Sequence, residues 1–231
     1  MTIKPICIIA ARGGSKRIPN KNIIKIFGKP MISYPITTAI KSKIFKNIFV
    51  STDSKKIKII SEKYGAKVPF LRKKKLANDK VGLQEVLVDF IKSNDFCSEE
   101  FMIFIYATAI LVDSEMISKA LKKFKQTKSD YLIGVQEFKS NPLRAMKINK
   151  NKLSFVNKFY SKKNTNNLNK FYYDAGSFFI FRTKTILKSP KKLPIKTTFY
   201  LHKKFEVCDI DDKQDLELAK ILLNNKINVE K

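Results

Sequence analysis

The chain alternates between short runs of consecutive apolar residues and longer stretches in which apolar side chains recur every three or four positions. Runs of the first kind are typical of buried strands, and stretches of the second kind are typical of helices that pack one face on a core. The predicted strands are Ile6–Ala10, Asn47–Asp53, Ala66–Phe70, Phe101–Tyr106, Tyr131–Gln136 and Phe178–Phe181. The predicted helices are Met31–Ser42, Ser54–Tyr64 ended by Gly65, Leu83–Ser93, Ser114–Lys125 capped by Asp113 or Ser114, and Gln214–Leu223.

This order of elements predicts an α/β fold, with helices flanking a mostly parallel sheet in a single domain of residues 1–231. The pattern weakens from Phe138 to Tyr172, where Lys and Asn are frequent. We expect a hairpin-rich insertion there, with a turn at residues 149–151. Ligands of such sheets bind at the carboxyl ends of the strands, so the segments after Ala10 and from Tyr106 to Thr108 are the first candidates for a site.

A loop rich in glycine and cations follows the first predicted strand. Residues 11–22 read Ala-Arg-Gly-Gly-Ser-Lys-Arg-Ile-Pro-Asn-Lys-Asn. Gly13 and Gly14 permit a sharp turn and a close approach of the backbone to a ligand, and successive N–H groups in such a turn can form an anion-binding nest. Four cations surround the glycines: Arg12, Lys16, Arg17 and Lys21. We predict a phosphate site, with a basic surface turn as the alternative; the glycine spacing is not that of a Walker A or dinucleotide loop.

Composition narrows the class of protein. The 44% apolar and 11% aromatic content excludes a disordered chain. No apolar stretch is long enough for a membrane helix and no secretory signal is apparent, so we expect a cytoplasmic protein with no membrane partner. Three cysteines far apart in sequence fit reduced, mostly buried thiols. The net charge of +27 is spread along the whole chain, which favours a polyanionic small substrate; a sequence-independent nucleic-acid binder is the alternative.

An acidic cluster stands out in this basic chain. Asp209 and Asp211 lie two positions apart, so in an extended segment their carboxylates point to the same side. Mg²⁺ prefers hard oxygen ligands and often shares its coordination with substrate phosphates. The alternative is that Asp211 or Asp212 caps the following helix, and both interpretations hold if Asp212 is the cap.

Four segments together resemble the acylneuraminate cytidylyltransferases, which make CMP-activated nonulosonic acids from CTP. These segments are residues 11–22, 27–32 (Phe-Gly-Lys-Pro-Met-Ile), 50–53 (Val-Ser-Thr-Asp) and 209–211 (Asp-Ile-Asp), and the resemblance extends from Ile6 to Ala219. It implies a Rossmann-like fold of the nucleotide-diphospho-sugar transferase type. It also implies that the sugar's anomeric hydroxyl attacks the α-phosphate of CTP and pyrophosphate leaves, so that positioning and charge stabilisation dominate catalysis.

The resemblance also implies roles for individual residues. Nucleotide contacts are expected from Ala11, Arg12, Gly13, Gly14, Ser15, Lys16, Lys21, Asn22, Arg72, Tyr106, Ala107 and Thr108, of which Arg12 and Lys21 would also be catalytic. Asp209 and Asp211 match the family's pair for Mg²⁺ or Mn²⁺, and Asp209 would also accept the hydroxyl proton. The expected sugar contacts are Arg144, Asp174 and Gly176.

Two segments bear on the sugar. Residues 105–109 (Ile-Tyr-Ala-Thr-Ala) and 173–176 (Tyr-Asp-Ala-Gly) look like the branch that activates pseudaminic acid, whereas sialic or legionaminic acid is the alternative. The chain departs from its relatives at Val81, where threonine is usual, and at Asn164, where an arginine is frequent. Relatives are commonly dimers, so we expect a homodimer with Phe138–Tyr172 as its candidate interface.

Overall fold

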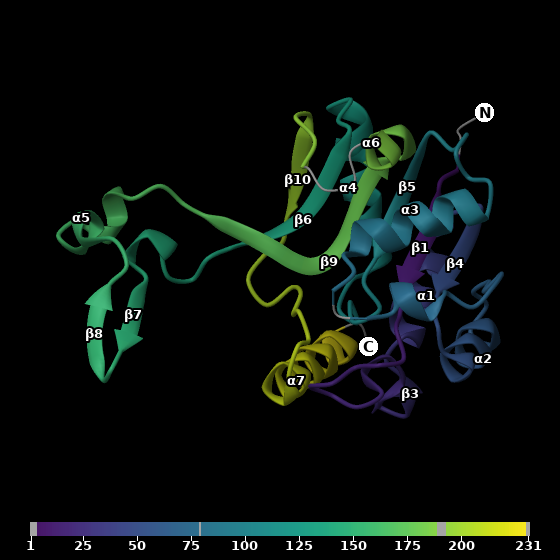
Figure 1. The fold of residues 1–231 in the computed structure, drawn as a ribbon, viewed down its shortest axis with the longest axis horizontal. Coiled ribbons are helices and arrows are strands. Elements are labelled where there is room, and N and C mark those ends of the chain that lie inside the picture. Colours follow the sequence, from purple (N-terminus) through teal and green to yellow (C-terminus); the bar gives the residue numbers. More distant parts are fainter. Residues whose placement is uncertain (1–3, 79, 189–192, 230–231) are drawn as a thin grey trace.

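A six-stranded sheet forms the centre of the protein (Figure 1). The computed structural model describes residues 4–78, 80–188 and 193–229. In spatial order the strands are β10 (Thr197–Leu201), β6 (Tyr131–Glu137), β9 (Tyr172–Arg182), β5 (Phe101–Ile105), β1 (Ile6–Ala10) and β4 (Asn47–Ser51). Strand β9 runs antiparallel to both β5 and β6, and the remaining pairs are parallel. The expected mostly parallel α/β sheet is therefore confirmed.

Helices cover both faces of the sheet because the central strands are apolar on both sides. Ile9 and Ile103 belong to one buried cluster with α1 (Ser33–Ser42) and α4 (Ser114–Gln126), whereas Ile8 and Phe104 belong to another with α3 (Leu83–Ser93). This alternation follows from the two-residue period of strands. Three further helices complete the body: α2 (Lys55–Lys63), α6 (Thr183–Lys188) and α7 (Lys213–Val229).

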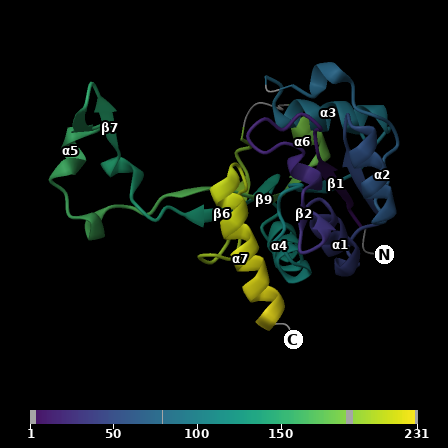
Figure 2. The same cartoon turned by 90° about the horizontal axis from the view of Figure 1, so that it is seen from below.

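A third buried cluster joins α7 to the segment after the first strand. Leu216 and Leu223 of α7 pack with Ile18 and Met31, close to the small hairpin of β2 (Lys25–Ile26) and β3 (Lys29–Pro30). The carboxyl-terminal helix therefore lies against the segment that contains the glycine loop, as Figure 2 also shows.

The helix caps follow the expected chemistry. Ser54 accepts a hydrogen bond from the Ile57 amide at the start of α2, and Gly65, with φ of +94°, follows its end. Asp113 caps α4 through the Met116 amide. Helix α3 has the predicted bounds.

Other boundaries differ from the predictions. The predicted strand at residues 66–70 forms only one isolated bridge, from Lys67 to Phe49. A second bridge joins Leu71, the residue after this segment, to Thr52. Strand β9 begins six residues before the predicted residues 178–181. The prediction missed this part because residues 172–174 are exposed and no apolar run precedes Phe178. Strand β10 was not predicted, since this edge strand alternates between partly buried and exposed positions. Helix α7 extends beyond the predicted Leu223.

The insertion forms a projecting arm, defined here as Phe138–Tyr172. It contains β7 (Met146–Asn149) and β8 (Lys152–Phe155), followed by α5 (Lys158–Ser161), and it stands away from the sheet in both views (Figures 1 and 2). Lys150 and Asn151 have φ of 46° and 61°, as the turn of a two-residue hairpin requires. The predicted hairpin is confirmed.

The three cysteines are free thiols, as expected. Burial raises the pKa of Cys7, which keeps that thiol protonated and unreactive. Cys97 is exposed, contrary to the expectation that the thiols are mostly buried. In the described part of the chain, none of the helices combines the length and apolar character needed to cross a bilayer.

Candidate active site

A cavity of about 430 Å³ opens at the carboxyl ends of β1 and β5. Its wall combines cations from the glycine loop, polar groups after β5 and an apolar patch contributed largely by the segment through α3. The lining residues are Ala10, Arg12, Ser15, Lys16, Arg17, Ile18, Lys21, Asn22, Arg72, Leu76, Asn78, Val81, Leu83, Val86, Phe104, Tyr106, Ala107, Thr108 and Asp211. A polyanion with one flat, less polar portion suits such a wall.

The glycine loop is held by side chains from distant segments. The Gly13 amide donates to Asp53 Oδ1 at 2.9 Å, and the buried Asn22 side chain donates to the Arg12 carbonyl at 2.9 Å. A Cβ on Gly13 would lie 3.1 Å from the Ser54 Cβ, so a larger residue would have to push Ser54 away by a few tenths of an ångström. The Ser15 amide donates to the Gly13 carbonyl. The expected nest of free amides is therefore wrong for Gly13 and Ser15, whose N–H groups already have acceptors within the protein.

Lys21 connects the loop to the acidic cluster. It begins the short helix η1 (Lys21–Ile23), and its Nζ donates to the Ile210 carbonyl at 2.6 Å and lies 3.5 Å from Asp211 Oδ1. Arg17 pairs with the same carboxylate oxygen at 2.9 Å. Residues 189 or more positions apart in sequence are thus brought to one rim of the cavity, with cations and a carboxylate side by side.

Asp212, and not Asp211, caps helix α7. Its carboxylate accepts from the Gln214 and Asp215 amides at 2.8 and 3.0 Å. Asp215 in turn accepts from the Asp211 and Asp212 amides. A helix cap and a metal site are therefore compatible interpretations of the acidic cluster, because Asp212 forms the cap and the Asp211 carboxylate stays at the cavity.

A glycine makes room for Asp209, which lies two residues before the lining residue Asp211 and does not itself line the cavity. Gly176 has φ of +59°, and a Cβ there would lie 2.6 Å from the Asp209 Cγ, so the strand accepts this carboxyl group only because position 176 has no side chain. Burial of the carboxyl group and the neighbouring Asp211 raise the pKa of Asp209, while Lys21 opposes them. A carboxylate in this setting has an increased affinity for a proton or a cation.

Tyr106, an expected nucleotide contact, and Asp174, an expected sugar contact, join the two segments that bear on the choice of sugar. The Tyr106 hydroxyl donates to Asp174 Oδ2 at 3.3 Å, and the Gly176 amide donates to Asp174 Oδ1 at 3.0 Å. Burial, followed by the charge of Asp174, raises the pKa of Tyr106, which keeps its hydroxyl a donor. Asp174 and Gly176 lie beside Asp209 and do not line the cavity itself.

Arg72 is a buried cation in the cavity wall. Its side chain is 5% exposed and lies 3.9 Å from Asp53 Oδ1, and its Nε has no hydrogen-bond partner among the described residues. Burial lowers the pKa of Arg72 and Asp53 opposes this, but a guanidinium stays charged. Burying a donor without a partner lowers the stability of the fold, so the Arg72 Nε–H would gain from an acceptor on a ligand.

The structure gathers most of the expected residues but not all. Ala11 is buried in the core, and Gly13 and Gly14 shape the loop without lining the cavity. Arg144 lies in the arm, where it donates to the Thr165 hydroxyl at 2.7 Å. It does not line the cavity of the same chain. Asn164, also in the arm, caps a short helical turn.

Sequence reasoning gave no role to Asp53, which holds both Gly13 and Arg72. The available signal was an acidic residue at the carboxyl end of a predicted strand. It also missed the apolar side of the cavity, which includes Leu76, Leu83 and Val86. No signal in the sequence separates these side chains from ordinary core residues.

Comparisons with known proteins show the family of this chain. The family model described as cytidylyltransferase matches residues 6–227. A pseudaminic acid cytidylyltransferase of Campylobacter jejuni is 39% identical, with 99% of each chain covered. An N-acylneuraminate cytidylyltransferase of Escherichia coli is 34% identical and covers all of this chain with 54% of its own length.

The fold has solved counterparts. A CMP:2-keto-3-deoxy-manno-octonic acid synthetase complexed with CTP superposes with a TM-score of 0.74 at 15% identity, covering 97% of this chain and 100% of its own. A 4-diphosphocytidyl-2C-methyl-D-erythritol synthase from Anaerococcus prevotii follows with a TM-score of 0.64 at 15% identity, over 96% and 99% of the two chains. The family match along nearly the whole chain shows that this protein belongs to the cytidylyltransferases, a family of nucleotidyltransferase enzymes.

Proposed function

We propose that the protein transfers CMP from CTP to pseudaminic acid and releases pyrophosphate. The observation that carries this proposal is the 39% identity to a pseudaminic acid cytidylyltransferase over 99% of both chains. The cavity supports it, because cations on one side and apolar residues on the other suit a triphosphate and a pyrimidine base.

In the proposed reaction the anomeric oxygen of the sugar forms a bond to the α-phosphorus of CTP, and the bond from that phosphorus to the bridging oxygen of pyrophosphate breaks. Arg12, Lys16 and Lys21 bind and orient the triphosphate and stabilise the negative charge that develops on it. Asp209 accepts the proton of the sugar hydroxyl on a carboxylate oxygen.

Asp209 and Asp211 are the residues that would hold Mg²⁺ or Mn²⁺. No cluster of three or more metal-binding side chains occurs among the described residues, but two carboxylates suffice where substrate phosphates complete the coordination. The donor set fits, since hard carboxylate oxygens are present. Burial, followed by the neighbouring Asp211, raises the pKa of Asp209, and a cation would relieve this repulsion. The cation, when bound, supplies positive charge to the phosphate oxygens.

Asn22 and Arg72 would fix the nucleotide, with Tyr106, Ala107 and Thr108 at the strand end. Asp174 and Gly176 would contact the sugar beside Asp209. Because the arm carries Arg144 away from its own cavity, Arg144 could meet a sugar only in the cavity of a second copy.

A homodimer through the arm belongs to the same proposal. The hairpin of β7 and β8 exposes 77% of Ile148 and 64% of Leu153, and Val156 and Phe159 are comparably exposed. An isolated two-stranded hairpin is at best marginally stable in water, so a partner surface would stabilise it. We also propose a cytoplasmic location, where CTP is available.

One assay tests the function. The protein is incubated with CTP, Mg²⁺ and, separately, pseudaminic, sialic and legionaminic acid, and released pyrophosphate is measured. We expect release with pseudaminic acid. Release only with sialic or legionaminic acid would refute the sugar assignment. No release with any of the three, together with salt-sensitive binding of single-stranded DNA, would favour the nucleic-acid alternative.

A further inference from the structure

A tight turn precedes the acidic segment of the site. It consists of Lys203–Val207, between β10 and Asp209. The Lys203 amide donates to Glu206 Oε2 at 2.8 Å, the Glu206 amide donates to the Lys203 carbonyl at 3.2 Å, and Phe205 has φ of +65°. Asp209 lies two residues after this turn, so the position of the turn helps to determine the position of the Asp209 carboxylate.

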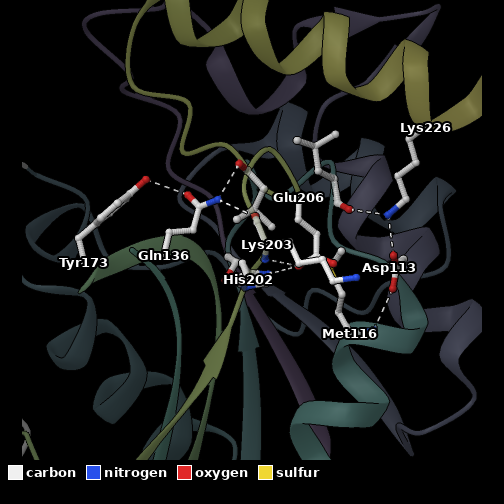
Figure 3. A network of polar contacts seen from close by, with 11 residues as sticks. Asp113, Met116, Gln136, Tyr173, His202, Lys203, Glu206 and Lys226 are labelled. Carbon is white, nitrogen blue, oxygen red and sulfur yellow. Dashed lines mark hydrogen bonds and ion pairs between the residues drawn. The ribbon is translucent and has the colours of Figure 1, made fainter. Parts of the chain in front are cut away.

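Gln136 holds this turn from the neighbouring strand β6 (Figure 3). Its Nε2 donates to the Lys203 carbonyl at 3.2 Å and to the Val207 carbonyl at 3.5 Å, so one amide group joins both ends of the turn. The Tyr173 hydroxyl donates to Gln136 Oε1 at 2.8 Å. The two backbone carbonyls can only accept, so the NH₂ group must face them, and the Tyr173 hydroxyl then meets the amide oxygen as a donor.

The residue before the turn is anchored separately. The His202 amide donates to the Val135 carbonyl at 2.9 Å, and its Nε2 shares a hydrogen bond with the Ser177 hydroxyl at 2.9 Å. His202 is buried, with its Nδ1 3.6 Å from Glu206 Oε2. The start of the turn is thus fixed by the backbone and by a buried side chain, and its far end is held by the buried Val207 side chain and by the Gln136 amide.

The far side of Asp209 is anchored as well. Ile210 is fully buried against α7, and its carbonyl accepts from Lys21. Asp209 therefore lies between a buried isoleucine and a turn fastened by Gln136. Without the Gln136 amide, the backbone between His202 and Ile210 loses its two hydrogen bonds from a side chain of β6.

We propose that Gln136, oriented by Tyr173, is a positioning residue for the Asp209 carboxylate. This inference rests on the proposed function, in which Asp209 holds a divalent cation. Gln136 is the next-to-last residue of β6, and Tyr173 is the second residue of β9. The arm leaves the sheet after Glu137 and returns at Tyr172, so the two residues that orient the Asp209 turn flank the roots of the arm.

The test compares Gln136→Met with Gln126→Met. Both substitutions exchange a glutamine for an apolar side chain of similar length; Gln126 ends α4, is exposed and lies outside the site. Tyr173→Phe, which removes one hydroxyl, is the second variant and keeps the test valid if Gln136→Met does not fold. Mn²⁺ binding is followed by electron paramagnetic resonance at saturating CTP without sugar. The half-saturating CTP concentration and the melting temperature are measured alongside.

We expect Gln136→Met to raise the half-saturating Mn²⁺ concentration about fivefold, which is about 1 kcal/mol and within the range of one net hydrogen bond. Tyr173→Phe should raise it about twofold, and Gln126→Met should leave it unchanged. Equal increases for Mn²⁺ and CTP, or no increase in either site variant, would overturn the proposal. If the wild-type protein releases no pyrophosphate with any nonulosonic acid, the proposed function fails, and this inference fails with it.

Discussion

The glycine loop and the arm are both rich in cations, yet the protein uses them differently. In the loop, the Lys21 side chain is 19% exposed and lies between the Ile210 carbonyl and Asp211. The arm has nine Lys and Arg residues and no acidic residue, and the ion pair of Lys170 goes to Glu137, just outside the arm. Lysine-rich sequence is therefore common to both regions, but only the loop has acceptors that fix its cations around a cavity.

The density of positive charge along the sequence therefore does not identify a site in this chain. Exposed ion pairs contribute about 0–1 kcal/mol, because water and salt screen them and long side chains lose entropy. A cation already restrained beside a cavity can stabilise negative charge on a ligand without losing further side-chain entropy during the reaction. Substitutions in the loop and in the arm test this contrast, and one at His202 tests the stability of the folded protein.

The largest effect is expected from Lys21→Gln. Loss of the charge at the phosphate end of the cavity should lower kcat about 10²–10³-fold, as is typical when one preorganised donor is removed. Lys147→Gln, the same change on the arm hairpin, should alter kcat less than twofold. Steady-state pyrophosphate release measures both, and equal losses in the two variants would refute the distinction between the regions.

The next effect concerns the arm. The paired substitution Ile148→Asp and Leu153→Asp places two charges at positions that face each other across the hairpin. If these side chains are buried between two copies, the dimer dissociation constant should rise at least about tenfold, since buried interface anchors contribute more than about 1 kcal/mol. Light scattering during size-exclusion chromatography measures the mass. A wild-type protein that is monomeric at all concentrations would contradict the dimer.

A smaller effect is expected from the anchor of the glycine loop. Asp53→Ala removes the acceptor of the Gly13 amide and the carboxylate beside Arg72, so the half-saturating CTP concentration should rise about tenfold, or about 1.4 kcal/mol. Asp53→Asn keeps an acceptor for Gly13 and should raise it less. Isothermal titration with CTP measures both. Identical values for alanine and asparagine would show that the hydrogen bond to Gly13 does not matter.

The smallest effect is on stability. Burial lowers the pKa of His202 from 6.5 to about 4, with Glu206 opposing. The folded protein therefore favours the neutral imidazole; the resulting stability is fully present above pH 6.5 and is lost as the pH falls from 6.5 through about 4. We expect a lower Tm at pH 5 than at pH 7, by about 2–4 °C per kcal/mol lost. The decrease should be smaller in His202→Gln, and an equal decrease would exclude His202 as the cause.

Much of the fold could be predicted because its central strands are buried on both faces. Ile6–Ala10 and Phe101–Ile105 are continuous apolar runs, and α3 shows a clear apolar stripe. The exposed start of β9 at residues 172–174 and the edge strand β10 gave weaker patterns, since fewer of their side chains enter the core.

Four features follow from the amino-acid sequence alone: the alternation of strands and helices, the glycine loop, the acidic pair and the family. These features are local, or they are read from motifs of a few residues. Tertiary structure alone decided that Asp53 holds Gly13, that Gly176 leaves room for Asp209 and that Arg144 stays outside its own cavity. Such contacts join residues that are tens of positions apart, so their geometry depends on the packing of the whole sheet and its helices, which no local pattern records.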